Sequence, residues 1–173
     1  MPELISVLDK DTIARYVADV AKQISDDYKD GDLVVIGVLK GAFVFMADLI
    51  RQLTLNSFTI DFIRLASYGG GTEPSGPVQI IHDVQEDLCD KDVLIVEDIF
   101  DTGLTLTSLC KHLQARAPRT IRICTFIDKG ERRQTDLQPD YVCYKIDRGF
   151  LVGYGLDYGE AYRNLPGIFN LKL

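Results

Sequence analysis

The chain has 173 residues and a formal net charge of −7; 46% of its residues are hydrophobic and 26% are charged. Such a length is typical of one domain, and this composition excludes collagen-like, disordered and repeat proteins. An acidic chain is also a poor general binder of nucleic acid or anionic membranes, because polyanions bind basic surfaces. We therefore expect one soluble domain, residues 1–173, that binds small molecules and neither nucleic acid nor membranes.

Helices and strands alternate in the first part of the chain. Between residues 12 and 28 the apolar residues recur at the spacing of an amphipathic helix, with Asp11 as its expected N-cap. The short β-branched run at 33–38 predicts a strand that is buried on both faces. We expect a helix at 41–53 and a strand at 58–65 after it.

A stretch rich in Gly, Pro and Ser, SYGGGTEPSGP at 67–77, comes next. It cannot form a regular element and is long enough for a mobile lid, which we place at about 66–77. The remaining predicted elements are strands at 78–81, 93–96, 121–127, 141–146 and 151–154, with a helix at 104–115. Strands that alternate with helices predict an α/β fold with a mostly parallel, twisted sheet flanked by helices.

Cysteine and histidine usage argues against disulfides and zinc. The four cysteines are widely spaced, without a C-x-x-C pair, and only two histidines are present. We expect reduced thiols. The first residues do not have the pattern of a signal peptide, and no apolar run is long enough to span a membrane. The sequence therefore predicts a cytoplasmic protein.

The residues after the strand at 93–96 have the chemistry of a sugar-phosphate site. In α/β sheets, ligands bind beyond the carboxyl ends of the strands. Glu97 and Asp98 follow the strand, Asp101 lies in the turn, and Gly103 begins the next helix, where backbone amides and the helix dipole favour a phosphate. Neighbouring carboxylates can accept hydrogen bonds from ribose hydroxyls, and beside a phosphate they favour Mg²⁺.

A plainer interpretation is that Asp101 or Thr102 only caps this helix and that Glu97 and Asp98 are solvated charges. The complete pattern, acid-acid-x-x-acid-Thr-Gly-x-Thr after a buried strand, favours the binding site. Two common phosphate motifs are absent, because the sequence contains neither G-x-x-x-x-G-K-[ST] nor G-x-G-x-x-G.

Residues 93–107, VLIVEDIFDTGLTLT, resemble the phosphoribosyl-diphosphate signature of the type I phosphoribosyltransferases. The turn of Leu39, Lys40 and Gly41 resembles the pyrophosphate-binding loop of the hypoxanthine-guanine members, in which the peptide before the lysine is often cis. Ser67 and Tyr68 resemble the start of the mobile lid in that family. These blocks occur in the order found in the family.

Two further blocks towards the C-terminus resemble the same family. Asp128 and Lys129 resemble the segment whose lysine contacts O6 of the purine. Residues 150–158, followed by Arg163, resemble the segment that stacks on the base and binds magnesium. The resemblance extends from about residue 33 to about residue 163, and it implies a small hood built from the N- and C-terminal segments.

The resemblance implies a reaction in purine salvage. The 5-phosphoribosyl group would pass from 5-phosphoribosyl diphosphate to N9 of a 6-oxopurine, hypoxanthine or guanine, giving IMP or GMP and pyrophosphate. Mg²⁺ would be the cofactor, and the assembly would be a homodimer or homotetramer. A regulator of the same fold that senses phosphoribosyl diphosphate, and a transferase for another base such as xanthine or a pyrimidine, are the alternatives.

The same resemblance assigns a role to individual residues. Asp101 would be the general acid/base at N7 of the purine. The implied metal ligands are Glu97, Asp98 and Asp157. The implied substrate-binding residues are Glu97 and Asp98 for the ribose, Thr102, Gly103, Leu104 and Thr105 for the 5′-phosphate, Leu39, Lys40, Gly41 and Arg163 for the pyrophosphate, Lys129, Phe150, Leu151 and Asp157 for the base, and Ser67 and Tyr68 for the lid.

Overall fold

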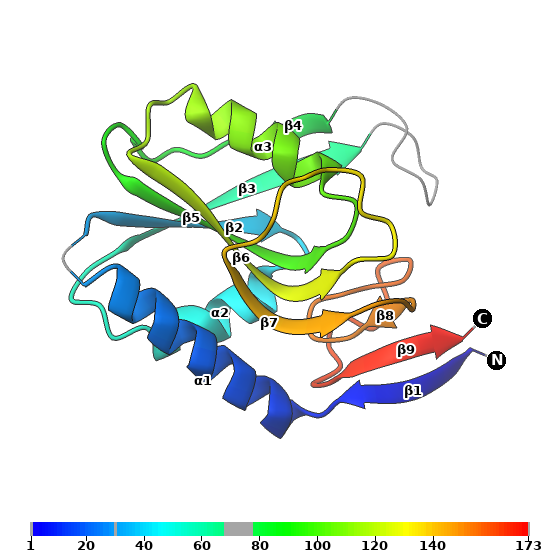
Figure 1. Ribbon diagram of the computed structural model, residues 1–173. Helices are drawn as coiled ribbons and strands as arrows, with labels where there is room; N and C mark the ends of the chain where they lie inside the picture. The colour runs from blue at the N-terminus through cyan, green and yellow to red at the C-terminus, as the bar shows by residue number, and fades with distance from the viewer. Residues whose placement is uncertain (1, 30, 68–77, 173) are drawn as a thin grey trace.

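A computed structural model describes residues 2–29, 31–67 and 78–172 of the protein. A six-stranded sheet has the order β4-β3-β2-β5-β6-β7, and a smaller sheet has the order β1-β9-β8 (Figure 1). The larger sheet consists of β2 (Leu33–Leu39), β3 (Thr59–Ser67), β4 (Val78–His82), β5 (Asp92–Phe100), β6 (Thr120–Lys129) and β7 (Tyr141–Ile146). The smaller sheet consists of β1 (Glu3–Leu8), β8 (Leu151–Val152) and β9 (Ile168–Lys172).

Helices cover both faces of the larger sheet. Helices α1 (Lys10–Asp27) and α2 (Phe43–Gln52) lie on one face, and α3 (Leu104–Gln114) lies on the other (Figure 1). Along the sheet order β3-β2-β5-β6-β7 each strand is parallel to the next, whereas β4, at the edge, is antiparallel to β3. The predicted α/β fold with a mostly parallel sheet is confirmed, and the carboxyl ends of β2, β5 and β6 meet at one edge.

Successive residues of the central strands contribute to two different cores. Val35 of β2 packs in the core beneath α1 and α2, whereas its neighbours Val34 and Ile36 pack in the core beneath α3. The short run of β-branched residues in β2 is therefore buried on both faces, as its composition predicts. Burial on both faces fixes the register of the strands and hence the positions of the residues at their carboxyl ends.

Several boundaries differ from the sequence-based expectations. The N-cap of α1 is Asp9, not Asp11, because Oδ1 of Asp9 accepts a hydrogen bond from the amide of Thr12 at 2.7 Å. Strand β5 continues to Phe100, well past the predicted end at residue 96, because it remains paired with β6. Glu97 and Asp98 therefore lie within the strand rather than after it, and Asp101 follows its end.

The two chain ends form a separate small sheet. Strand β1 pairs antiparallel with β9, and β9 pairs with β8, so the expected hood of N- and C-terminal segments is present (Figure 1). Sequence analysis placed no strand at β1 or β9, and it extended β8 to residue 154. The strand ends earlier because Gly153 and Tyr154 have positive φ angles of 96° and 52°.

The predicted lid, at about 66–77, lies almost entirely outside the described residues. Ser67 is described as the last residue of β3, and Tyr68 falls in the undescribed part. None of the described helices combines the length and the apolar character that a membrane crossing requires.

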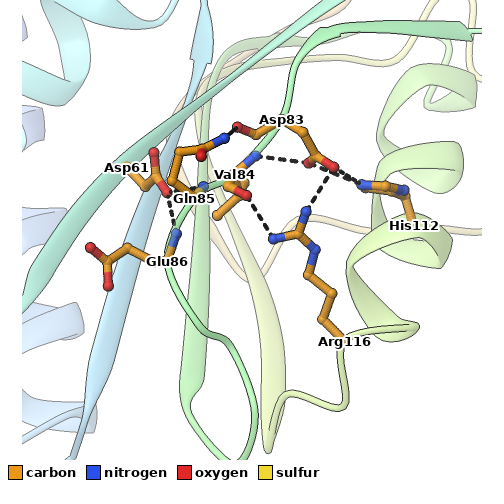
Figure 2. Close-up of polar contacts among 7 residues, drawn as sticks. All are labelled: Asp61, Asp83, Val84, Gln85, Glu86, His112 and Arg116. Carbon is orange, nitrogen blue, oxygen red and sulfur yellow. Dashed lines mark hydrogen bonds and ion pairs between the residues drawn. The ribbon is translucent and has the colours of Figure 1, made fainter.

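A polar network joins the end of β4 to α3 (Figure 2). Both carboxylate oxygens of Asp83 lie 3.0 Å from Nε2 of His112, and Nη2 of Arg116 donates to Asp83 at 2.7 Å. The other guanidinium nitrogen of Arg116 donates to the carbonyl of Val84 at 2.7 Å. Nearby, Asp61 of β3 accepts from two successive backbone amides of the same loop. The loop between β4 and β5 is thus held to both α3 and β3.

Substitution of Asp83 by alanine should lower the free energy of unfolding by about 1–2 kcal/mol at neutral pH, because Arg116 and His112 lose their shared acceptor. Partial burial acts to raise the pKa of Asp83, but hydrogen bonds from His112 and the Val84 amide hold it below its usual value. A lowered folded-state pKa gives stability that is present above the unfolded-state pKa and lost as the pH falls through the folded-state value. Urea unfolding should therefore show the difference shrinking below about pH 4.

Glu86→Ala is the matched control, because only the backbone of Glu86 takes part in the network (Figure 2). Its unfolding free energy should remain within about 0.5 kcal/mol of the unsubstituted protein. Equal effects of the two substitutions would show that the side chain of Asp83 does not hold the loop.

Candidate active site

Two adjacent carboxylates of β5, buried Glu97 and half-buried Asp98, lie at the edge where the parallel strands end. Glu97 has 8% exposure, and its Oε1 accepts a hydrogen bond from the amide of Asp98 at 3.0 Å. Burial and the charge of Asp98 raise the pKa of Glu97 well above its usual value, and burial also raises the pKa of Asp98. The charge of Arg163 only partly offsets the effect of burial on Asp98, so the two carboxylates form a site that favours a positive ligand.

The turn after β5 forms a small hollow. The N-cap of α3 is Gly103, which has a φ of 82° and no side-chain cap, and the amide of Leu104 donates to Oγ1 of Thr102 at 3.3 Å. A Cβ atom at Gly103 would overlap the hydroxyl of Thr135, so only glycine fits. The hollow has a volume of about 200 Å³ and is lined by Glu97, Asp98, Ile99, Phe100, Asp101, Thr102, Gly103, Thr105 and Leu106.

Asp101 does not cap α3, which removes the plainer interpretation of this residue. Its Oδ1 is buried and has no hydrogen-bond partner among the residues that the structure describes. Its Oδ2 lies 3.9 Å from Nε of Arg132. A buried carboxylate oxygen on the wall of the hollow has unused capacity to accept a proton or a hydrogen bond.

The turn after β2 packs directly against the acidic strand. The peptide between Leu39 and Lys40 is cis, as the family resemblance implies. A Cβ atom at Gly41 would overlap a carboxylate oxygen of Asp98, and a Cβ atom at Gly155 would overlap the carbonyl oxygen of Gly41. This close approach brings the turn after β2, the end of β5 and the C-terminal segment together.

Arg163 is fixed in this same region by the C-terminal segment. Its Nη1 donates to the carbonyl of Gly155 at 2.8 Å, and its Nη2 lies 2.9 Å from Oδ1 of Asp157. The other oxygen of Asp157 accepts from the amide of Glu160 at 2.8 Å. Lys40, whose Nζ is 3.0 Å from Glu160, joins the same group of charges. The structure thus brings together the two cations that the sequence assigns to pyrophosphate.

The three expected metal ligands are not gathered in one cluster. Within the described ranges, no group of three or more His, Cys, Asp or Glu side chains is placed to hold a metal ion. Both carboxylate oxygens of Asp157 already have partners, whereas Glu97 and Asp98 are adjacent in β5, the first buried and the second half-buried. The donor set of Glu97 and Asp98 fits a Mg²⁺ ion that takes few protein ligands and completes its shell with substrate oxygens and water.

The residues expected at the base lie at the end of β6 and in the hood. Lys129 is the last residue of β6 and has 8% exposure, and its Nζ lies 3.7 Å from a carboxylate oxygen of Glu131. The ring of Phe150 is 43% exposed and packs edge-to-face on Tyr158, with 5.5 Å between the ring centroids. Leu151 is buried in β8. An exposed aromatic face and a nearly buried ammonium suit a planar ligand with an acceptor on its edge.

Sequence reasoning missed Arg133, which links the phosphate loop to the end of β6. The Nε of Arg133 donates to the carbonyl of Asp101 at 3.0 Å, and its guanidinium carbon lies 3.9 Å from the ring centroid of Phe100. Its Nη2 also pairs with the carboxylate of Asp128. The available signal was a pair of adjacent arginines in a loop directly after Lys129.

A second, larger hollow is not lined by the carboxylates of β5 or by the loop at 102–105. It has a volume of about 450 Å³ and lies between the first turns of α1 and α2 and the segment 154–166. Apolar side chains such as Ile13 and Phe43 line it, and Arg163 is the residue it shares with the group of charges around Lys40. The carboxylates of β5 line the smaller hollow only.

Residues 5–159 match the sequence model of the phosphoribosyl transferase domain family, and the chain belongs to this family. The chain is 46% identical over 166 residues to the hypoxanthine-guanine phosphoribosyltransferase of Staphylococcus epidermidis, covering 96% of this chain and 92% of that protein. The corresponding protein of Staphylococcus aureus is 45% identical over the same share of each chain.

Solved structures of the same kind share the fold. A hypoxanthine phosphoribosyltransferase from Staphylococcus aureus superimposes with a TM-score of 0.92 at 45% identity, covering 96% of this chain and 90% of that one. A hypoxanthine-guanine phosphoribosyltransferase from Bacillus anthracis gives a TM-score of 0.92 at 41% identity, with both chains fully covered.

Replacing Arg133 with alanine should lower the free energy of unfolding by about 2–3 kcal/mol, because the nearly buried carboxylate of Asp128 loses its cation and the Asp101 carbonyl loses its donor. Chemical denaturation measures this loss. Arg132→Ala is the matched control: Arg132 is 43% exposed and 3.9 Å from its only ion-pair partner within the described ranges, so it should change stability by less than about 0.5 kcal/mol. A larger loss for Arg132→Ala would contradict the linking role of Arg133.

Proposed function

We propose that the protein transfers the 5-phosphoribosyl group from 5-phosphoribosyl diphosphate to N9 of a 6-oxopurine, hypoxanthine or guanine, in purine salvage. The observation that carries this proposal is the hollow lined by Glu97, Asp98 and residues of the loop at 102–105, together with the Asp101 oxygen that has no hydrogen-bond partner among the described residues. The identity of 45–46% to proteins named hypoxanthine-guanine phosphoribosyltransferase supports the same reaction.

The sugar phosphate would be held by the β5 strand end and the loop that follows it. Thr102, Gly103, Leu104 and Thr105 would bind the 5′-phosphate through hydroxyls and backbone amides at the start of α3. Glu97 and Asp98 would accept hydrogen bonds from the ribose hydroxyls. These contacts fix C1 of the ribose between the leaving group and the incoming base, so that positioning supplies much of the rate enhancement.

Pyrophosphate would leave toward the turn of Leu39, Lys40 and Gly41. Lys40 and Arg163 would stabilise the negative charge that develops on the leaving group as the bond to C1 lengthens. Glu97 and Asp98 would hold a Mg²⁺ ion, which would supply positive charge beside the diphosphate. The raised pKa values of both carboxylates support this assignment, because a bound cation would remove the cost of ionising them. Asp157 would be a further metal ligand.

The purine would lie between β6 and the hood. Phe150 would stack on the ring, Leu151 and Asp157 would contact its edge, and Lys129 would donate to O6. A 6-amino group has no acceptor to offer at that position, so an adenine would leave the nearly buried Lys129 unpaired. Asp101 would take or return the proton at N7 as the N9 bond forms.

We also propose a lid, an assembly and a location for the protein. Ser67 and Tyr68 would close over the reaction centre and exclude water, which would otherwise compete as the nucleophile. A homodimer or homotetramer in the cytoplasm is the expected form. In the hypoxanthine phosphoribosyltransferase of Trypanosoma cruzi, which is 39% identical, the C-terminal region has a role in the oligomeric state and enzymatic activity.

A panel of purines tests the proposed reaction. With phosphoribosyl diphosphate and Mg²⁺, hypoxanthine or guanine should yield nucleotide and pyrophosphate in equal amounts, measured by chromatography and a coupled pyrophosphate assay. Adenine should react at least about 10²-fold more slowly, because it leaves Lys129 without an acceptor. Binding of phosphoribosyl diphosphate without nucleotide from any base would instead favour a sensor of the same fold, and preference for xanthine or a pyrimidine would identify another transferase.

Asp101→Asn should lower kcat by about 10²- to 10⁴-fold, because the amide cannot exchange the purine proton. The affinity for phosphoribosyl diphosphate, measured by calorimetry, should change little, since Asp101 is assigned to the base rather than to the sugar. Asp136→Asn removes the same charge from an exposed position in the loop after β6 and should leave both quantities unchanged. An equal loss of affinity and turnover in Asp101→Asn would assign Asp101 to substrate binding.

A further inference from the structure

Lys40 and Arg163 share a single carboxylate in the structure. Nζ of Lys40 lies 3.0 Å from Oε2 of Glu160, and Nη2 of Arg163 lies 3.3 Å from Oε1 of the same residue. Each oxygen of Glu160 therefore contacts one of the two cations. These cations come from the turn after β2 and from the C-terminal segment, so Glu160 joins two parts of the chain that are distant in sequence.

The backbone holds Glu160 in a tight turn. Tyr158 and Ala161 exchange two backbone hydrogen bonds, of 3.2 and 3.1 Å, and the two residues between them, Gly159 and Glu160, have φ angles of 58° and 68°. Positive φ at both central positions is the geometry of a type I′ turn, whose second central position favours glycine. Glutamate is thus present where the backbone disfavours a side chain, and its carboxylate contacts both cations.

Of the acceptors around Arg163, Glu160 is held least firmly. Asp157 is 29% exposed and has both oxygens in contacts. Glu160 is 64% exposed, and among the described residues its carboxylate pairs with the two cations alone. Hydrogen bonds from Lys40 and then Arg163 hold the pKa of Glu160 below its usual value, so the carboxylate is ionised at neutral pH. An ionised, exposed and weakly held carboxylate can be exchanged for another anion.

We propose that Glu160 is an internal competitor of pyrophosphate, occupying in the free protein the contacts on Lys40 and Arg163 that the pyrophosphate group takes when it binds. This inference rests on the proposed function, which assigns these two cations to pyrophosphate. Binding then breaks two ion pairs, and departure of the product allows them to form again. Glu160 therefore weakens the affinity for pyrophosphate while it keeps the cations in position.

Calorimetric titration of inorganic pyrophosphate in the presence of Mg²⁺ tests the inference. Glu160→Gln should bind pyrophosphate about threefold to tenfold more tightly than the unsubstituted protein, because two exposed ion pairs no longer compete. Glu131→Gln is the matched control, since it removes the same charge from an exposed carboxylate that pairs with Lys129 rather than with the pyrophosphate cations. Unchanged or weaker binding by Glu160→Gln, or an equal gain in Glu131→Gln, would overturn the inference.

A double substitution separates competition for a contact from the general field of a negative charge. In the background Lys40→Met one of the two competing ion pairs is absent. The fold-increase in pyrophosphate affinity caused by Glu160→Gln should therefore fall to less than half of its value in the unsubstituted background. An undiminished gain in that background would overturn the inference, because a long-range field does not depend on the contact with Lys40.

The proposed function and this inference can fail separately. Unsubstituted protein that forms nucleotide from hypoxanthine or guanine, together with unaltered pyrophosphate affinity in Glu160→Gln, overturns only the role of Glu160. If the unsubstituted protein forms no nucleotide from any purine, the proposed reaction is wrong, and the pyrophosphate titration still decides whether Glu160 competes for the two cations.

Discussion

The candidate site depends on a contact where three backbone segments meet without room for a Cβ atom between them. Gly41 packs against the carboxylate of Asp98, and Gly155 packs against the carbonyl of Gly41. Because the turn after β2 is thereby held between β5 and the C-terminal segment, Lys40 and Arg163 are kept beside the acidic strand. Any side chain larger than hydrogen at either glycine would separate the cations from the carboxylates on which the proposed chemistry depends.

The charges of the site explain how an acidic protein could bind an anionic substrate. Glu97 and Asp98 have raised pKa values, so their ionised forms are poorly stabilised until a cation joins them. Glu160 has the opposite character, because it is exposed and already paired with two cations. In the proposed mechanism the first pair recruits the metal that accompanies the substrate, and Glu160 yields its place to the substrate's phosphates.

Sequence reasoning was most successful where the chemistry is local. The order of helices and strands, the buried character of β2 and the loop at 102–105 follow from residues that are close together in the chain. It was wrong where long-range pairing decides: β5 extends because β6 continues beside it, and β1 forms because β9 lies against it. Arg133 and Glu160 were missed for the same reason, since their roles come from partners that no local pattern reveals. The roles of the site residues toward substrate remain predictions.

The pairing of β1 with β9 has a consequence for how the protein is made. Glu3 lies opposite Lys172, so β1 leaves the ribosome well before β9, the strand with which it pairs. The strands of the larger sheet are all contained between residues 33 and 146 and can pair earlier in synthesis. During that interval β1 is an open edge that could join another chain, and the edge is closed only when β9 arrives. The smaller sheet can therefore be completed only after every strand of the larger sheet has been synthesised.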